Sequence, residues 1–166
     1  MIRIFVFAGF ILMAACGYQL KQPYELHPAL GKTHLALSLT SPLYQPLATA
    51  LTNQGIVLVK PEAAEAVLVI GQNHLVKEIQ SIGVNNRVQE YRLVYQLDFR
   101  VLLGDDVVMD SNTLQLSKDY AFDIGQITGA QTEERLLREQ LYEDMAQMII
   151  RTLANQKLKP VDSKSM

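Results

Sequence analysis

Apolar and polar positions alternate most regularly between residues 90 and 103. This stretch reads EYRLVYQLDFRVLL, and every odd-numbered position in it is apolar. The face so formed comprises Tyr91, Leu93, Tyr95, Leu97, Phe99, Val101 and Leu103. A period of two residues is typical of a β-strand with one buried face. The pattern therefore predicts a long strand whose other face, with Arg92 and Arg100, is polar.

Three further segments carry strand patterns. THLALSLT at residues 33–40 alternates, residues 66–81 begin with a continuous apolar run, and residues 107–122 form another long strand. Turn residues separate the three long strands, with GVNNR at 83–87 and GDD at 104–106. Because such turns join antiparallel hairpins, we expect the long strands to pair in sequence order.

Two segments have helical character. Residues 41–55 place Pro46 near a helix start and Gly55 at its end, positions that favour these residues. Beyond residue 128 an apolar stripe recurs at the spacing of an α-helix. Its members are Leu137, Leu141, Met145, Met148, Ile149 and Leu153.

The order of these elements predicts an α+β domain. A strand, a helix, three long strands and a second helix follow one another, which gives the order β-α-β-β-β-α. We expect a two-layer sandwich, with two helices packed on one face of a mostly antiparallel four-stranded sheet. The opposite face would be open, as antiparallel sheets permit. IVLVK at residues 56–60 is compatible with one additional brief strand.

The first residues differ from the rest of the chain. Arg3 is followed by an apolar block over residues 4–13 and by Ala14 and Ala15, directly before Cys16. This layout is typical of a secretory signal, with an N-terminal core helix or strand as the alternative. Small residues before a cysteine resemble the bacterial lipobox, which implies that Cys16 becomes the lipid-modified first residue of the mature chain.

The lipobox resemblance and the patterns above together give the boundaries that we expect along the chain. Residues 1–15 would be a signal peptide, residues 16–31 a lipidated tether, residues 32–155 the folded domain and residues 156–166 a flexible polar tail. The residue after the cysteine is not the aspartate that retains such proteins at the inner membrane. The resemblance therefore implies a lipid anchor in the outer membrane, on its periplasmic side. We expect no cofactor besides the covalent lipid on Cys16.

Composition narrows the classes of function. The chain has 166 residues, of which 49% are hydrophobic and 19% charged, and its formal net charge is −2. This balance argues against disorder and against binding of nucleic acid through bulk positive charge. A single cysteine excludes an internal disulfide.

No grouping of residues in the sequence points to catalysis. The three histidines are isolated, and no metal-ligand spacing, nucleophile elbow or phosphate loop occurs. Asp105–Asp106 is expected in a hairpin turn. Glu133–Glu134 is expected in the first turn of the second helix, where acids offset the helix dipole. We therefore expect that the protein is not an enzyme.

Several motifs together resemble the lipopolysaccharide-assembly lipoprotein family LptE. CGYQL at residues 16–20 resembles the start of the mature chain in that family, and QPLATALTNQGIVLV its first helix and the following segment. QEYRLVYQLDFRVL and SKDYAFD resemble its later strands, and EERLLREQLYEDMAQMIIRTL its closing amphipathic helix. The resemblance covers about residues 16–153.

The resemblance to LptE implies a non-enzymatic role. The chain would plug the outer-membrane β-barrel LptD as a heterodimer, assist assembly of the barrel and take part in lipopolysaccharide transport to the cell surface. The expected partners are LptD, lipopolysaccharide and the outer membrane. The alternative is a free-standing, periplasm-facing lipoprotein that binds a small hydrophobic or cell-wall ligand.

Basic residues on the predicted strands are candidates for contact with lipopolysaccharide phosphates. They are Lys77, Arg87, Arg92, Arg100 and Lys118. Because the net charge is negative, anion binding would need a local basic patch. The alternative is that these side chains are solvated or pair with Asp98 and Asp119.

Two segments are candidates for contact with the barrel. Asn85 in GVNNR, and Tyr120 and Phe122 in DYAFDIGQ, would insert into its lumen, because aromatic side chains are favoured at such contacts. The alternative is that Tyr120 and Phe122 close the core of the sheet itself.

Overall fold

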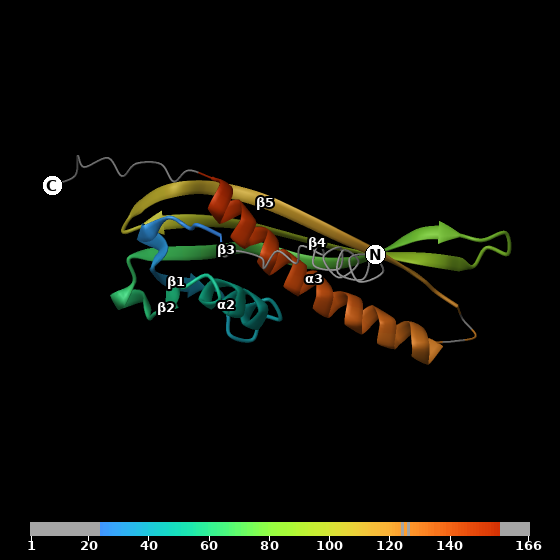
Figure 1. Cartoon of the computed structure of the whole chain (residues 1–166). Helices are drawn as coiled ribbons and strands as arrows, with labels where there is room; N and C mark the ends of the chain where they lie inside the picture. Colours follow the sequence, from blue (N-terminus) through green and yellow to red (C-terminus); the bar gives the residue numbers. More distant parts are fainter. Residues whose placement is uncertain (1–23, 124, 126, 157–166) are drawn as a thin grey trace, which may run out of the picture.

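A five-stranded sheet forms one layer of the molecule (Figure 1). Its strands are β1 (Lys32–Ala36), β2 (Val57–Leu58), β3 (Ala66–Ile82), β4 (Val88–Leu103) and β5 (Asp106–Ala121). Their spatial order is β2-β1-β3-β4-β5. This computed structural model describes residues 24–123, 125 and 127–156. The expected signal peptide, Cys16 and residues 157–166 of the expected tail lie outside the described residues.

The sheet is mixed and has five strands, whereas the sequence predicted four mostly antiparallel ones. β1 is parallel to both β2 and β3, while β3, β4 and β5 pair antiparallel as predicted. Val57 and Leu58 form β2 beside Lys32 and Thr33. Helix α2 (Tyr44–Thr52) carries the chain back along β1, and such a crossover makes the next strand parallel. Two residues carry too little alternation for this pairing to be predicted.

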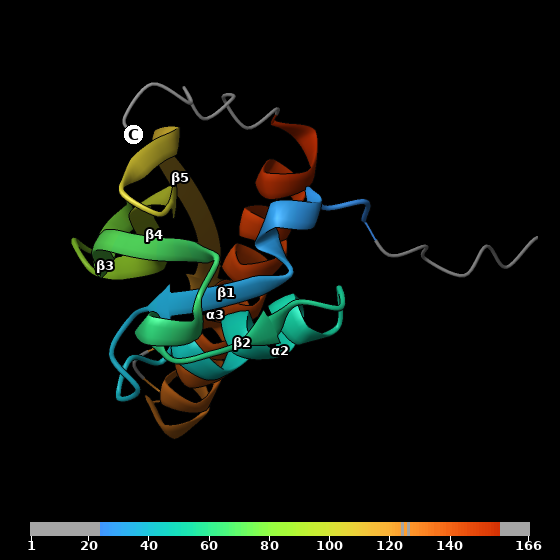
Figure 2. The ribbon, with the colours of Figure 1, turned by 90° about the vertical axis from the view of Figure 1, so that its left-hand side faces the viewer.

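The second layer consists of α2 and α3 (Ile127–Asn155), which lie on the same face of the sheet (Figure 2). Leu47 and Leu51 of α2 are fully buried. After α2 the chain turns at Gly55, whose φ of 83° is a conformation that favours glycine and stops the helix. The predicted two-layer α+β arrangement, with both helices on one face, is confirmed.

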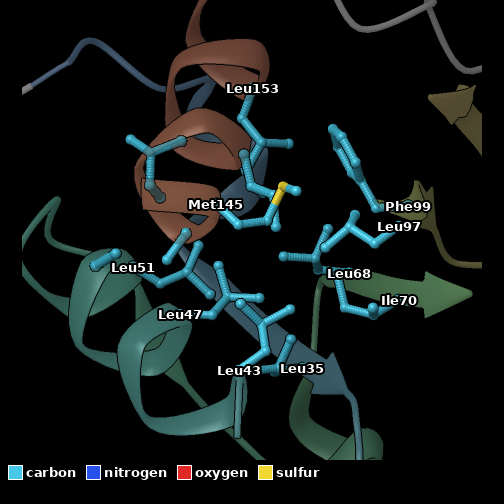
Figure 3. Packing of buried hydrophobic residues seen from close by; sticks show 14 of the residues in the cluster. Leu35, Leu43, Leu47, Leu51, Leu68, Ile70, Leu97, Phe99, Met145 and Leu153 are labelled. Carbon is cyan, nitrogen blue, oxygen red and sulfur yellow. The ribbon is translucent and has the colours of Figure 1, made fainter. Parts of the chain in front are cut away.

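The hydrophobic core lies between the sheet and the two helices (Figure 3). The most buried residues of β4 are each at most 1% exposed and are Leu93, Tyr95, Leu97, Phe99 and Val101. From the predicted helical stripe, the buried members are Leu141, Met145, Ile149 and Leu153. Leu137 and Met148 are half-buried at its margin. Both periodicities therefore predicted the faces that are buried.

Residues 24–31, which we expected within the tether, lie against the domain. Pro28–Leu30 form a short 3₁₀-helix, and Leu30 is buried in the core. The backbone N–H of Tyr24 donates to Oε1 of Gln54 at 2.7 Å. The contacts of the domain therefore extend to Tyr24, and residues 16–23 lie outside the described residues.

The β3–β4 hairpin extends beyond the core, as the right-hand side of Figure 1 shows. β1 pairs with β3 only as far as Val69, and from Gly71 onwards β3 is largely exposed. Ile79 and Ile82 are 56% and 57% exposed, and Val84 at the tip is fully exposed. The hairpin therefore presents apolar side chains at one accessible end of the molecule.

Candidate functional site

The base of the hairpin, the end of β5 and the first half of α3 meet at this end of the sheet. The N–H of Phe122 donates to the carbonyl oxygen of Gln89 at 2.7 Å, which holds the chain after β5 beside the hairpin. Tyr91 and Tyr120 are partners across β4 and β5, with ring centroids 5.8 Å apart. Phe122 stands edge-on to Tyr91 at 5.2 Å. We call Tyr91, Tyr120 and Phe122 the aromatic cluster.

Lys77 of β3 lies over the aromatic cluster. Its Nζ is 3.9 Å from the ring centroid of Tyr91 and 5.4 Å from that of Tyr120, within the range of cation–π attraction. The same ammonium group is 2.7 Å from Oε2 of Glu134 on α3. Burial acts to lower the pKa of Lys77, but the hydrogen bonds and charges of Glu134 and Tyr120 together outweigh it, and the pKa lies above its usual range. Lys77 therefore links the aromatic cluster to α3 as a cation.

Glu134 accepts hydrogen bonds from three side chains. Arg138, one helical turn further on, donates to Oε1 from Nε at 3.0 Å and from Nη2 at 2.7 Å. The hydroxyl of Tyr120 donates to Oε2, which also accepts from Lys77. Partial burial acts to raise the pKa of Glu134, but these hydrogen bonds lower it to about 2. The carboxylate is therefore ionised, and both of its oxygens accept hydrogen bonds.

Two surface hollows adjoin the aromatic cluster and share Phe122. The first, which we call the hairpin hollow, has a volume of about 530 Å³ and is lined by Gly83, Val84, Asn85, Arg87, Val88, Gln89, Tyr91, Phe122 and Asp123. The second, the helix hollow, has a volume of about 490 Å³ and is lined by Lys77, Tyr120, Phe122, Ala130, Gln131, Glu134, Arg135 and Arg138. Three cationic side chains and one carboxylate line the helix hollow, and one of these cations, Arg135, pairs through Nη1 with Oε1 of Glu139 at 2.8 Å.

A tight turn at the hairpin tip places Asn85 and Arg87 on the hairpin hollow. The N–H of Asn86 donates to the carbonyl of Gly83 at 3.0 Å, and the N–H of Gly83 donates to that of Arg87 at 2.8 Å. Asn86 has a φ of 55°, a left-handed conformation in which asparagine is enriched. The predicted GVNNR turn is thus the element that holds these two side chains.

Two of the five basic candidates, Lys77 and Lys118, lie on the helix-covered face of the sheet. Both are cross-strand partners of buried Leu93, and directly paired residues share a face. The Nζ of Lys118 pairs with Oδ2 of Asp144 on α3 at 2.8 Å. Lys77 lines the helix hollow, whereas Lys118 is part of a separate contact with α3.

Arg92 and Arg100 alternate with buried residues of β4 and therefore lie on the open face of the sheet. Arg92 donates from Nε and Nη2 to the two carboxylate oxygens of Asp119, at 2.7 and 2.8 Å. This hydrogen bonding raises the pKa of Arg92 and lowers that of Asp119. It is the pairing that the alternative interpretation expected. The five candidates do not form one patch, and of them only Arg87 and Lys77 line the two hollows.

The candidates for contact with the barrel lie at the same end of the sheet. Tyr120 is 4% exposed and belongs to the core, as the alternative interpretation expected. Phe122 is half-buried and lines both hollows, while Asn85 is exposed. Of the two aromatic candidates, Phe122 is therefore the one with an accessible ring.

The sequence did not single out Glu134 and Arg138 as site residues. It placed Glu133–Glu134 in the first turn of the helix, which is wrong because α3 begins at Ile127 and its first turn precedes them. The spacing of Glu134 and Arg138 is a local signal for a helical ion pair. The contact with Lys77 joins positions 57 residues apart, and no local pattern predicts it.

The part of the chain that the structure describes contains no group of three or more histidine, cysteine, aspartate or glutamate side chains that could hold a metal ion. Within the same residues, no helix combines the length and the apolar character needed to cross a membrane.

Solved structures with a similar fold include lipoproteins from three bacteria. A minor lipoprotein from Acinetobacter baumannii is 21% identical, with 80% of this chain and 97% of that chain covered and a TM-score of 0.67. Rare lipoprotein B from Shewanella oneidensis is 22% identical, with 74% and 93% covered and a TM-score of 0.65. A lipoprotein B from Nitrosomonas europaea is 23% identical, with 83% and 90% covered and a TM-score of 0.70. At these identities the likeness shows the fold alone.

Comparison with curated proteins gave no match. The family model of LptE, described as lipopolysaccharide-assembly, matches residues 30–153, which include every strand and nearly all of both helices. The match agrees with the motifs that the sequence shares with that family. The chain therefore belongs to the LptE family of lipopolysaccharide-assembly lipoproteins.

Proposed function

We propose that this LptE-family protein stands inside the LptD barrel of the outer membrane as a plug. In this role it assists assembly of the barrel and takes part in lipopolysaccharide transport to the cell surface, without catalysing a reaction. The observation that carries the proposal is the family match over residues 30–153, because it spans the whole sheet and nearly all of both helices. The exposed apolar side chains and the two hollows at the hairpin end also support the proposal.

The projecting hairpin has the character of a surface that a partner covers. Ile79, Ile82 and Val84 are exposed on it, and Phe122 lies at its base. Clustered exposed apolar side chains are costly in water and commonly mark an interface. In our proposal this end, with Asn85 and Phe122, enters the barrel lumen.

The two hollows offer the kinds of group that lipopolysaccharide would need. Its phosphates would be contacted by Arg87 at the hairpin hollow and by Lys77 at the helix hollow. Its apolar parts would lie against Phe122. Arg92 and Lys118 pair with Asp119 and Asp144 and line neither hollow, so they are weaker candidates, and Arg100 lies on the open face.

The anchor of the proposed plug is a covalent lipid on Cys16, in the outer membrane on the periplasmic side. Each methylene of an acyl chain buried in the bilayer contributes about 0.8 kcal/mol, so that several chains hold a protein stably at the membrane. The segment between Cys16 and Tyr24 would then join the anchor to the domain.

Copurification tests the proposal directly. The full chain with a C-terminal tag would be isolated from detergent-solubilised outer membranes. A plug brings down a very large β-barrel protein in equal amount. A free-standing lipoprotein, the alternative from the sequence, would be recovered without it.

Photocrosslinking then tests which end of the domain meets the barrel. A photoreactive amino acid would replace Asn85 or Phe122, and Asp105, in the turn between β4 and β5, provides the matched exposed control. We expect barrel adducts from positions 85 and 122 in preference to 105. Adducts from position 105 alone would mean that the domain enters the barrel in the opposite orientation.

A further inference from the structure

One basic side chain on the sheet differs from the others in having no partner. Four of the five basic residues on the strands pair with a carboxylate at 2.7 to 3.1 Å. These pairs are Lys32–Glu65, Lys77–Glu134, Arg92–Asp119 and Lys118–Asp144. The fifth residue, Arg100, is exposed on the open face, and its guanidinium group takes part in no ion pair or hydrogen bond with another described residue.

The neighbouring carboxylate on the open face of β4 is engaged elsewhere. Asp98 lies two positions before Arg100 and lines the same hollow. Its Oδ1 accepts a hydrogen bond from Oγ1 of Thr113 on β5 at 2.7 Å. The donors of Arg100 are therefore available to an acceptor from outside the chain.

Two β-bulges flank this part of β4. Residues 71–72 of β3 lie opposite the single residue Asp98, and residues 110–111 of β5 lie opposite Arg100. Bulges re-aim side chains and are frequent next to functional sites. Between them lies a hollow of about 240 Å³, which we call the bulge hollow. It is lined by Val69, Gly71, Asp98, Phe99, Arg100 and Ser111.

We propose that the bulge hollow binds an aspartate or glutamate side chain of a protein partner, with Arg100 donating to its carboxylate. This inference rests on the proposed function, in which the partner is the barrel, and it assigns the open face of the sheet to the luminal wall. The lumen of such barrels is polar, and so is the open face beside Arg100, which presents side chains such as Gln96 and Thr113.

The chemistry of the hollow favours a single carboxylate. Arg92 on the same face already binds both oxygens of Asp119 through Nε and Nη2, and Arg100 offers the same planar fork. A phosphorylated amphiphile fits less well. The bulge hollow has about half the volume of the hairpin hollow, and its aromatic residue, Phe99, is only 1% exposed. The charge of Asp98 would also repel a doubly charged phosphate more than a carboxylate.

Exchange of the chain in the barrel complex tests the proposal. Complexes with the tagged full chain would be mixed in detergent with excess untagged wild-type chain, and loss of the tag from the barrel would be timed. Arg100→Gln removes the charge. Arg151→Gln, at an exposed position on α3, changes the net charge equally. We expect at least about tenfold faster exchange for R100Q and less than about a twofold change for R151Q, because losing one member of an interfacial charge pair acts mainly on dissociation.

Gly71→Val tests the hollow apart from the charge. A Cβ at position 71 would make ordinary contact with Cβ of Asp98 at 3.5 Å, so a side chain there fits and takes up space in the hollow. We expect G71V to exchange faster than the wild type although it keeps Arg100. Thermal unfolding of each isolated chain shows which variants are folded, and R100Q decides the question if G71V is not.

A photoreactive amino acid in place of Ser111, an exposed residue of the hollow, identifies the partner residue. We expect the adduct to map to a luminal segment of the barrel that contains an aspartate or glutamate. Arg100→Glu combined with arginine at that acidic position should restore slow exchange, whereas each change alone should speed it.

Three outcomes would overturn the inference. An R100Q complex that exchanges at the wild-type rate, or no faster than R151Q, rejects this inference and leaves the plug standing. Weaker binding of lipopolysaccharide by the isolated R100Q chain would assign the hollow to a phosphate instead of a carboxylate. If the wild type brings down no barrel, the plug proposal fails and this inference fails with it.

Discussion

At the scale of single residues, two of the ion pairs that involve the predicted basic candidates differ in what surrounds them. The Arg92–Asp119 pair on the open face has side chains that are 36% and 48% exposed, and such surface pairs contribute little to stability. Lys77 and Glu134 are 33% and 19% exposed, and the carboxylate has further donors in Arg138 and Tyr120. The second group is therefore the one whose removal should be measurable.

Glu134 should make stability depend on acid pH. Its folded-state pKa of about 2 lies below the ordinary value of 4.5, so its contribution is present above pH 4.5 and is lost as the pH falls toward 2. We expect E134Q to lower the free energy of unfolding at pH 7 by about 1 to 2 kcal/mol and to reduce the loss below pH 4.5. Urea unfolding across this pH range measures both effects. E133Q should retain the acid dependence of the wild type, and an equal flattening in E133Q would contradict the assignment.

Tyr95 illustrates a buried polar group without a partner. Its side chain is 1% exposed, and its hydroxyl has no hydrogen-bond partner among the described residues. Burial raises the pKa of this hydroxyl. Its ring stands edge-on to Tyr142 at 5.1 Å, a contact that phenylalanine would keep.

Tyr95→Phe should therefore be neutral or stabilise the protein by up to about 1 kcal/mol, because it removes a hydroxyl that loses hydration on burial. Tyr95→Ala should cost about 3 to 5 kcal/mol through the cavity that it leaves. Thermal or urea unfolding of both variants measures these two changes in stability. A loss of more than about 1 kcal/mol for Y95F would indicate that a bound water satisfies the hydroxyl.

At the scale of elements, two glycines differ in backbone conformation, since one lies in a left-handed turn position and the other within a helix. Gly104 begins the turn between β4 and β5 with a φ of 59°, a left-handed conformation. Gly129 lies exposed within α3, where a Cβ would have nothing within 4 Å apart from its chain neighbours and the backbone of its own helix. The same substitution should therefore act in opposite directions at the two sites.

Gly104→Ala should destabilise the protein by about 1 kcal/mol, because an alanine in the left-handed region crowds its own carbonyl. Gly129→Ala should stabilise it by about 0.5 to 1 kcal/mol, because alanine loses less backbone freedom in a helix. Chemical denaturation of the two single variants gives the comparison. Effects of the same sign would contradict the conformations assigned to these positions.

At the scale of the whole molecule, the core and the projecting hairpin differ in how much of the rest of the structure packs against them. Residues 93–101 of β4 pair with β3 and β5 on both sides and lie under the helices. The hairpin beyond Gly71 has exposed side chains and lies outside the part of β3 that pairs with β1. Local opening should therefore be easier in the hairpin.

Amide hydrogen exchange should reveal this difference. We expect amides of residues 74–89 to exchange at least about a hundredfold faster than those of residues 93–101, because few buried contacts oppose their opening. If the plug proposal holds, the purified barrel complex should slow exchange in the hairpin and leave the core unchanged. Uniform protection of both segments in the isolated domain would contradict the prediction.

Much of the fold was predictable from the chain because its signals are local. The alternation in β4 identified its buried side chains, and the spacing from Leu141 to Leu153 identified the buried face of α3. Turn residues such as Gly104 joined the long strands in sequence order. These patterns depend only on the period of a strand or helix and on the conformations that a turn allows.

Other features were decided only by the tertiary structure. The pairing of Val57 and Leu58 with β1 depends on where α2 returns the chain, which two residues cannot encode. Lys77 and Glu134, 57 positions apart, meet because α3 packs over the face of the sheet on which Lys77 lies. The sequence by itself determined the periodic faces and the family motifs, since these are properties of neighbouring residues. The site was decided by the fold, since a contact between distant residues exists only once the layers are assembled.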